Sequence, residues 1–120
     1  MQRLGRLETQ VMDVVWRTGY PVSVRDVLDN LQTDREPAYT TVMTVMDNLN
    51  RKGWLTRERE GRAYIYEATR SRLEAAADAM RELLAYTGDP AGALLHFARG
   101  ATAAESKALT RGLRERGRRR

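Results

Sequence analysis

Ala-Tyr-Thr-Thr-Val-Met-Thr-Val-Met-Asp-Asn-Leu-Asn-Arg-Lys-Gly, residues 38–53, is the stretch that decides the fold. Its apolar side chains recur at spacings of three and four residues, at Val42, Val45, Met46 and Leu49. That spacing predicts a helix that buries one face. Gly53 ends the predicted helix, and Arg51 and Lys52 complement the negative end of its dipole.

The opposite face of this helix is rich in threonine. Its polar positions are Thr40, Thr41, Thr44, Asp47, Asn48 and Arg51. Threonine is a mediocre helix former because its branched carbon restricts χ1, so three of them in two turns need a further reason. Short hydroxyl side chains near a helix N-terminus can donate to phosphate or contact base edges and thymine methyl groups in the major groove of DNA. A threonine-rich surface helix with no partner is the plain alternative.

Two shorter helices are predicted upstream. The first covers about residues 7–18 and ends at Gly19, and Tyr20-Pro21-Val22 is an extended link because proline disfavours helix in the residue before it. Ser23 and Asp26 have the spacing of a capping box that opens the second helix. Residues 32–37 then form a turn. Two amphipathic helices joined in this way, the second with an unusual polar face, predict a helix-turn-helix.

After Gly53 the hydrophobic period changes from 3.6 to 2. Residues 54–59 and 62–67 are strand-like and flank Glu60-Gly61, which predicts a β-hairpin. We expect Arg57, Arg59 and Arg62 near its tip, where they could contact the phosphate backbone. The interleaved Glu58 and Glu60 weaken that electrostatic case, and a hairpin that only covers a core edge is the alternative.

The predicted fold is mostly α with a small β-hairpin. Residues 1–68 form a winged helix-turn-helix that binds DNA, and residues 69–120 form a three-helix dimerisation subdomain with a basic tail at 116–120. The large apolar residues expected at the dimer contact are Leu73, Met80, Leu83, Leu84, Leu94, Leu95, Phe97, Leu109 and Leu113. A two-fold dimer would bury this surplus and present two reading helices about one turn of DNA apart. Folding back onto the same chain is the alternative.

Composition limits the classes of function that this chain could have. The chain has 120 residues and a net charge of +5, which favours a polyanionic partner. It has no cysteine, which excludes disulfides, thiol nucleophiles and thiolate metal sites. No apolar run reaches membrane-spanning length, so we expect a cytoplasmic protein. The single histidine, His96, stands in an apolar run where packing is a better explanation than catalysis. We therefore predict no enzymatic activity, no cofactor and no metal.

Three motifs resemble those of the penicillinase-repressor family, BlaI and MecI. They are Leu7-Glu-Thr-Gln-Val-Met-Asp-Val-Val-Trp16, then residues 39–55, and Gly61-Arg-Ala-Tyr-Ile-Tyr66. The resemblance covers nearly the whole chain. It implies a dimeric repressor of palindromic operators with TACA and TGTA elements, usually upstream of β-lactam resistance genes. Position by position, it implies groove contacts from Thr40, Thr41, Met43 and Thr44, with Asn48 and Arg51 beside them and Arg62 at the wing.

The chain also departs from this family. In the resistance repressors a membrane sensor metalloprotease cuts an Asn-Phe bond in the penultimate helix, and the matching pair here is His96-Phe97. Phe97 is retained but the asparagine is not, so inactivation by cleavage stays open. Copper-responsive relatives bind metal through C-terminal cysteines, which are missing here. At Met43 the resistance repressors often carry a basic residue, and methionine cannot make an arginine's bidentate contact with guanine.

Two other functions fit the same sequence. A winged helix can serve protein contacts alone, or a small-molecule effector can regulate DNA binding.

Overall fold

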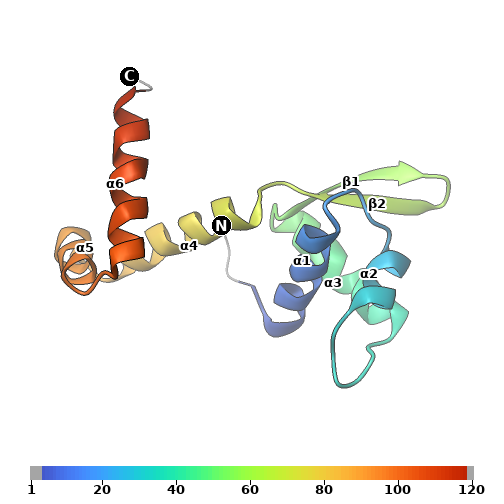
Figure 1. Ribbon diagram of the computed structural model, residues 1–120. Coiled ribbons are helices and arrows are strands. Elements are labelled where there is room, and N and C mark those ends of the chain that lie inside the picture. The colour runs from blue at the N-terminus through green and yellow to red at the C-terminus, as the bar shows by residue number, and fades with distance from the viewer. Residues whose placement is uncertain (1–3, 119–120) are drawn as a thin grey trace. The chain divides into compact units, whose positions relative to one another are not determined.

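The computed structural model describes residues 4–118 and confirms the predicted order of elements (Figure 1). The helices and strands are α1 (Arg6–Thr18), α2 (Val24–Asn30), α3 (Tyr39–Arg51), β1 (Leu55–Glu60), β2 (Ala63–Ala68), α4 (Arg72–Tyr86), α5 (Pro90–Arg99) and α6 (Ala103–Arg118). The chain divides into two compact units, residues 1–79 and 80–120, so the division falls inside α4. The functional boundary predicted after residue 68 stays a prediction.

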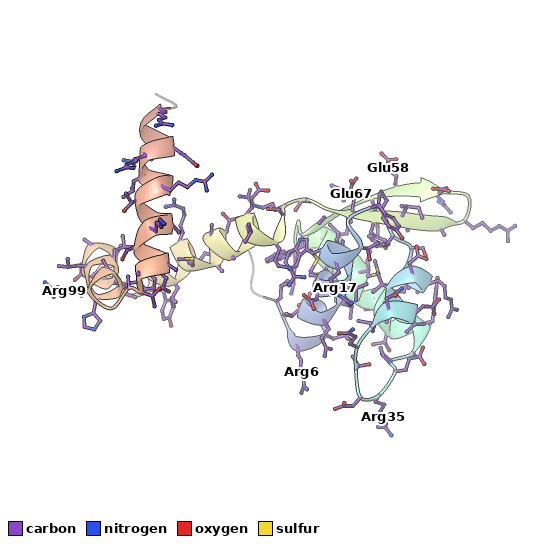
Figure 2. All side chains as sticks on the ribbon, viewed as in Figure 1. Arg6, Arg17, Arg35, Glu58, Glu67 and Arg99 are labelled. Carbon is purple, nitrogen blue, oxygen red and sulfur yellow. The ribbon has the colours of Figure 1, made fainter. Side chains whose placement is uncertain are left out.

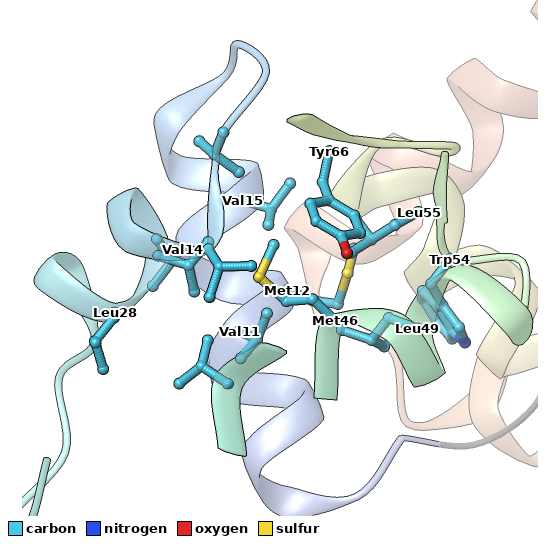
Figure 3. Close-up of a cluster of buried hydrophobic side chains, with 14 of the residues drawn as sticks. Val11, Met12, Val14, Val15, Leu28, Met46, Leu49, Trp54, Leu55 and Tyr66 are labelled. Carbon is cyan, nitrogen blue, oxygen red and sulfur yellow. The ribbon is translucent and has the colours of Figure 1, made fainter. Parts of the chain in front are cut away.

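One hydrophobic core holds the first unit together. α1 contributes Val11, Met12, Val14 and Val15, and α3 contributes Val42, Met46 and Leu49 from the face predicted to be buried. Figure 3 shows Met12 and Met46 beside Tyr66 of β2 and Leu55 of β1. Val45, on the edge of the same α3 face, is half-buried. The three-and-four spacing of α3 therefore fixes which of its sides meets the core.

The hairpin is antiparallel and attached to the core at its base. Leu55 pairs with Ala68 at one end and Glu60 with Ala63 at the other. The link after α1 pairs with the outer side of β2, since Val22 and Tyr66 exchange backbone hydrogen bonds of 2.9 and 2.7 Å. Trp16 of α1 packs edge-on against Trp54, with ring centroids 6.3 Å apart. These contacts fix the base of the wing against α1.

The turn of the hairpin lies one residue later than the sequence predicted. β1 includes Glu60, and Gly61-Arg62 forms the two-residue connection, not Glu60-Gly61. Gly61 has φ of 65°, whereas no described non-glycine residue has a positive φ. A hairpin turn with glycine at its first central position matches the twist of the strands, which Glu-Gly in the same place would not. Arg62 is therefore placed at the very tip.

Side-chain caps define the starts of α2 and α6, the first of them as the sequence predicted. Ser23 and Asp26 form the capping box of α2, with Asp26 N–H donating to Ser23 Oγ at 3.1 Å and Ser23 N–H donating to Asp26 Oδ2 at 3.0 Å. The equivalent pair of Thr102 and Glu105 opens α6. That last helix continues to Arg118, into the basic tail predicted at residues 116–120, and Arg119 and Arg120 of that tail lie outside the described residues.

The second unit has no core of its own within the described chain. No residue of α5 or α6 is buried, and Leu109 and Leu113 are 45% and 62% exposed. In α4 the buried residue is Ala75, whereas Leu73 is 81% exposed. The apolar faces predicted for these helices thus remain uncovered in a single chain. None of the helices described is both long and apolar enough to cross a membrane.

An ion pair joins the first helix to the end of α3. Lys52 Nζ donates to Glu8 Oε1 at 2.8 Å, and both side chains are mostly covered. Burial alone would raise the pKa of Glu8, but hydrogen bonds from Lys52 and from Gly5 N–H outweigh it and hold the pKa below its ordinary value of 4.5. Glu8 therefore stabilises the fold above that pH, and the contribution is lost as the pH falls below it.

We expect Glu8→Gln to lower the free energy of unfolding by about 1 kcal/mol at neutral pH, because a charged hydrogen bond is removed. The difference from wild type should shrink below the ordinary pKa of 4.5, because Glu8 takes up a proton in the unfolded chain before it does so in the native protein. Urea denaturation followed by the fluorescence of Trp16 and Trp54 measures it. Glu36→Gln, on an exposed loop, is the control. A difference of the same size at acidic and neutral pH would contradict this role.

Candidate nucleic-acid interface

The outer face of α3 is open to solvent along its length. Thr40, Thr41, Thr44 and Arg51 are exposed, Met43 is 44% exposed and Asn48 is half-buried. The six α3 residues predicted to contact DNA therefore share one accessible surface, opposite Val42, Met46 and Leu49. The threonine hydroxyls are not covered by the rest of the described chain, which the proposed reading surface requires.

The start of α3 is suited to a negatively charged partner. Ala38 occupies the N-cap position and provides no side-chain hydrogen bond, so the first backbone N–H groups of the helix have no side-chain cap. Free N–H groups and the positive end of the helix dipole favour phosphate. Arg25 of α2 lies over the ring of Tyr39, 5.0 Å from its centroid, and adds a cation beside this end. The two helices of the helix-turn-helix, α2 and α3, thus both contribute positive charge at the start of α3.

The hydroxyl of Thr44 is already engaged within the helix. Its Oγ1 donates to the carbonyl oxygen of Thr40 at 3.0 Å. The oxygen keeps its lone pairs and the methyl group stays available, because a hydroxyl has one hydrogen to donate. Thr44 can therefore accept a hydrogen bond from a base or contact a thymine methyl group, but it is not a free donor.

An acidic residue stands in the middle of this otherwise neutral or basic face. Asp47 pairs with Arg51 one turn later in α3 and with Arg57 of β1, whose Nη1 lies 2.7 Å from Asp47 Oδ1. The hydrogen bonds from Arg51 and Arg57 hold the pKa of Asp47 below its ordinary value. Two guanidinium groups thus neutralise a carboxylate that would otherwise repel phosphate, and the one from Arg57 connects the wing to α3.

The side chain of Arg57 is fixed on two sides. Besides Asp47, it lies over the ring of Tyr64 at 4.1 Å from the centroid, and Tyr64 meets Tyr66 edge-on at 6.3 Å. Arg57 is opposite Tyr66 in the hairpin register, so it lies in the middle of β1 and not near the tip, and the sequence-based prediction of its position was wrong. Its role in this geometry is to hold the wing against α3.

The charges of the hairpin are separated onto two faces. Successive residues of a strand point to opposite sides, so Arg57 and Arg59 share one face with Tyr64 and Tyr66, while Glu58 and Glu60 lie on the other. Figure 2 shows Glu58 and Glu67 on the side of the hairpin that points away from the helices of this unit. Arg and Glu therefore alternate along the sequence of the strand but lie on opposite faces of the folded hairpin. Arg62 is exposed at the tip.

The link between α3 and the wing was missed from the sequence. Asp47 and Arg51 stand four residues apart, which is a recognisable helix pair. Arg57 gave no such signal, because its contact with Asp47 depends on how the hairpin folds back over α3.

On α5, His96 and Phe97 are both exposed, with Phe97 at 47%. No group of described residues has the composition of a metal site.

Comparisons with known proteins agree with this arrangement. A family model described as "Penicillinase repressor" matches residues 4–115. The transcriptional regulator BlaI of Mycobacterium tuberculosis is 40% identical to the chain over 118 residues, covering 96% of this chain and 86% of that protein. The solution structure of the DNA-binding domain of the repressor BlaI superposes with a TM-score of 0.51 at 24% identity, covering 60% of this chain and 90% of that structure. This likeness confirms the predicted winged-helix fold.

We expect Asp47→Asn to loosen the wing while leaving the core folded, because Arg57 would no longer have a charged partner on α3. Amide hydrogen exchange should become faster in β1 and β2 and stay unchanged in α1. Glu58→Gln removes a carboxylate from the opposite face of the same strand and serves as the matched control. If the hairpin exchanges at the same rate in both variants, Asp47 does not hold the wing.

Proposed function

Because the chain belongs to the penicillinase repressor family, we propose that this BlaI-like transcriptional repressor binds a palindromic DNA operator as a homodimer. Its relatives are transcriptional regulators and not enzymes. The observation that carries the proposal is the exposed row of Thr40, Thr41 and Thr44 on α3, on the side opposite a fully buried apolar face. Such a helix can enter a groove without disturbing its own packing.

Sequence is read in this proposal by the outer face of α3 in the major groove. Thr44 and Met43 offer a methyl group and a thioether side chain to thymine methyls, and Asn48 can contact base edges. Thr40 and Thr41, near the helix start, contact phosphate together with the free N–H groups. At the far end of the helix, Arg51 reaches the backbone. Arg62 at the wing tip adds a phosphate contact that carries no sequence information.

Dimerisation is proposed through the apolar faces of α4, α5 and α6. Nine large side chains are assigned to the contact, and eight of them are exposed: Leu73, Met80, Leu83, Leu94, Leu95, Phe97, Leu109 and Leu113, with Leu84 half-buried. Exposed apolar surface of this extent marks an interaction site. A second copy is the simplest partner, because a two-fold axis makes the same patch complementary to itself.

The family resemblance supports an operator with TACA and TGTA elements and a role in β-lactam response or related genes, in the cytoplasm. The same resemblance implies a sensor metalloprotease as a partner. Its cleavage point corresponds to the His96–Phe97 bond, which lies inside α5. Backbone groups in a helix interior are hydrogen-bonded, so a protease would have to unwind this helix before cutting it.

Binding of fluorescent duplexes at one fixed salt concentration tests the proposed function. A TACA/TGTA palindrome should bind at least about 100-fold more tightly than a scrambled duplex of equal length, as specific regulators do. Equal affinity for the two duplexes would contradict sequence-specific repression and would favour a winged helix used for protein contacts. Adding candidate small molecules to the bound complex tests the effector alternative in the same assay.

We expect Thr44→Ala to weaken binding to the palindrome by about 1 kcal/mol, roughly fivefold, and to leave binding to scrambled DNA unchanged. The reason is that the substitution removes a contact with a base and leaves the phosphate contacts in place. Arg62→Ala is the contrasting variant and should weaken both duplexes alike. Should Thr44→Ala weaken the two duplexes equally, Thr44 does not read sequence.

We expect Leu83→Asp to raise the dimer dissociation constant by at least about 100-fold, because a charge would enter an apolar contact. Sedimentation velocity measures the change. The control is Arg81→Asp, two residues earlier and so roughly 200° around α4. A Leu83→Asp protein that remains a dimer at the same concentration would show that α4 does not form the contact.

A further inference from the structure

The charge of the chain is distributed very unevenly between its two units. Residues 1–79 contain twelve Lys and Arg and twelve Asp and Glu, so this unit has no formal net charge. Residues 80–120 contain nine basic and four acidic residues and therefore carry the entire net charge of +5. The unit that contains the reading helix is thus neutral, although affinity for DNA depends mainly on phosphate neutralisation.

Most of the excess positive charge stands on one side of α6. Lys107, Arg111, Arg114 and Arg118 follow one another at spacings of four, three and four residues, which places them on one helix face. We call this set the basic face of α6. Leu109 and Leu113 are each two residues from Arg111, about 200° around the helix. The basic face and the apolar face proposed for dimerisation can therefore be occupied at the same time.

The cations of the basic face have few carboxylate partners, whereas several cations of the first unit are paired. There, Lys52, Arg57, Arg70 and Arg72 are paired with carboxylates at 2.6–2.8 Å. On α6, Arg111 donates to Glu115 at 2.9 Å, and no described residue forms an ion pair with Lys107, Arg114 or Arg118. All four side chains are exposed. A row of four exposed cations, three of them without an ion pair to any described residue, favours an anionic partner over a purely structural role.

We propose that the basic face of α6 binds the sugar-phosphate backbone of DNA and supplies much of the sequence-independent affinity of the repressor. The inference rests on the proposed function, because DNA is the ligand proposed for the repressor. The basic face contacts phosphate groups of the DNA and no base edges. The last helix would then be a binding element as well as part of the dimer contact.

The dimensions and chemistry of the face fit a duplex. Eleven residues of helix separate Lys107 from Arg118, a length of about 17 Å. A duplex carries one phosphate charge per roughly 1.7 Å of its axis, so the face spans about ten of them. Three of the four cations are arginines, whose planar groups match phosphate oxygens in pairs. A neutral reading unit alone would give weak non-specific binding, and this face provides the missing positive charge.

The test compares the salt dependence of DNA binding for the full-length wild type and for Lys107→Gln/Arg114→Gln/Arg118→Gln. Glutamine keeps helix propensity close to that of lysine and arginine. Removing one cation from a phosphate should lower the slope of log affinity against log salt by about 0.9, so the slope should fall by roughly 2 to 3. The fall should be equal on palindromic and scrambled duplexes, with affinity near 0.1 M salt reduced by about tenfold or more.

Two matched proteins separate a binding face from a general effect of net charge. Arg6→Gln/Arg81→Gln/Arg99→Gln removes the same number of charges from other exposed positions, two of which, Arg6 and Arg99, are labelled in Figure 2. It should keep the slope of the wild type. Arg114→Lys/Arg118→Lys retains the charges and should keep most of it. Circular dichroism and sedimentation are expected to be unchanged in all of these proteins.

The inference is overturned if the α6 triple variant keeps the wild-type slope on both duplexes, a result that would favour an acidic protein as the partner of this face. It is also overturned if the control triple variant shows an equal fall in slope. A wild type that binds both duplexes equally tightly would contradict the proposed function instead. In that case the slope on scrambled DNA still decides whether α6 binds phosphate.

Discussion

Burial of one side of α3 is the constraint on which the rest of the structure depends. Val42, Met46 and Leu49 have no exposed surface, and they are packed with α1 and the base of the hairpin in one core. Rotating the helix by one residue would expose these side chains and bury polar ones, at several kcal/mol for the set. The threonine row is therefore held outward by the hydrophobic effect and not by any contact of its own.

The two units have different roles in the proposed binding of DNA. The first unit is neutral and several of its cations form internal ion pairs, such as Arg57 with Asp47, which positions the wing against α3. The second unit carries the net positive charge on a helix whose cations are mostly unpaired. In this proposal α3, which belongs to a unit without net charge, discriminates between DNA sequences. The basic face of α6 raises the affinity for DNA of any sequence.

Much of the fold and the reading surface could be predicted from the sequence because they depend on local patterns. The spacing of Val42, Met46 and Leu49, the capping box at Ser23 and the change of period after Gly53 each involve neighbouring residues. The hairpin turn was misplaced by one residue, because the backbone demand for a positive φ at Gly61 outweighs the composition of the flanking strands. The contact of Arg57 with Asp47 could not be predicted, since it requires the folded position of the wing.

The most direct test of the central claim is an NMR titration of the full-length protein with a half-operator duplex and with a scrambled duplex. We predict that the amide shifts specific to the half-operator fall on the outer face of α3, at Met43, Thr44 and Asn48, while core residues such as Val11 do not move. Sequence-specific shifts confined to other elements, with α3 unaffected, would contradict the assignment of α3 as the reading helix.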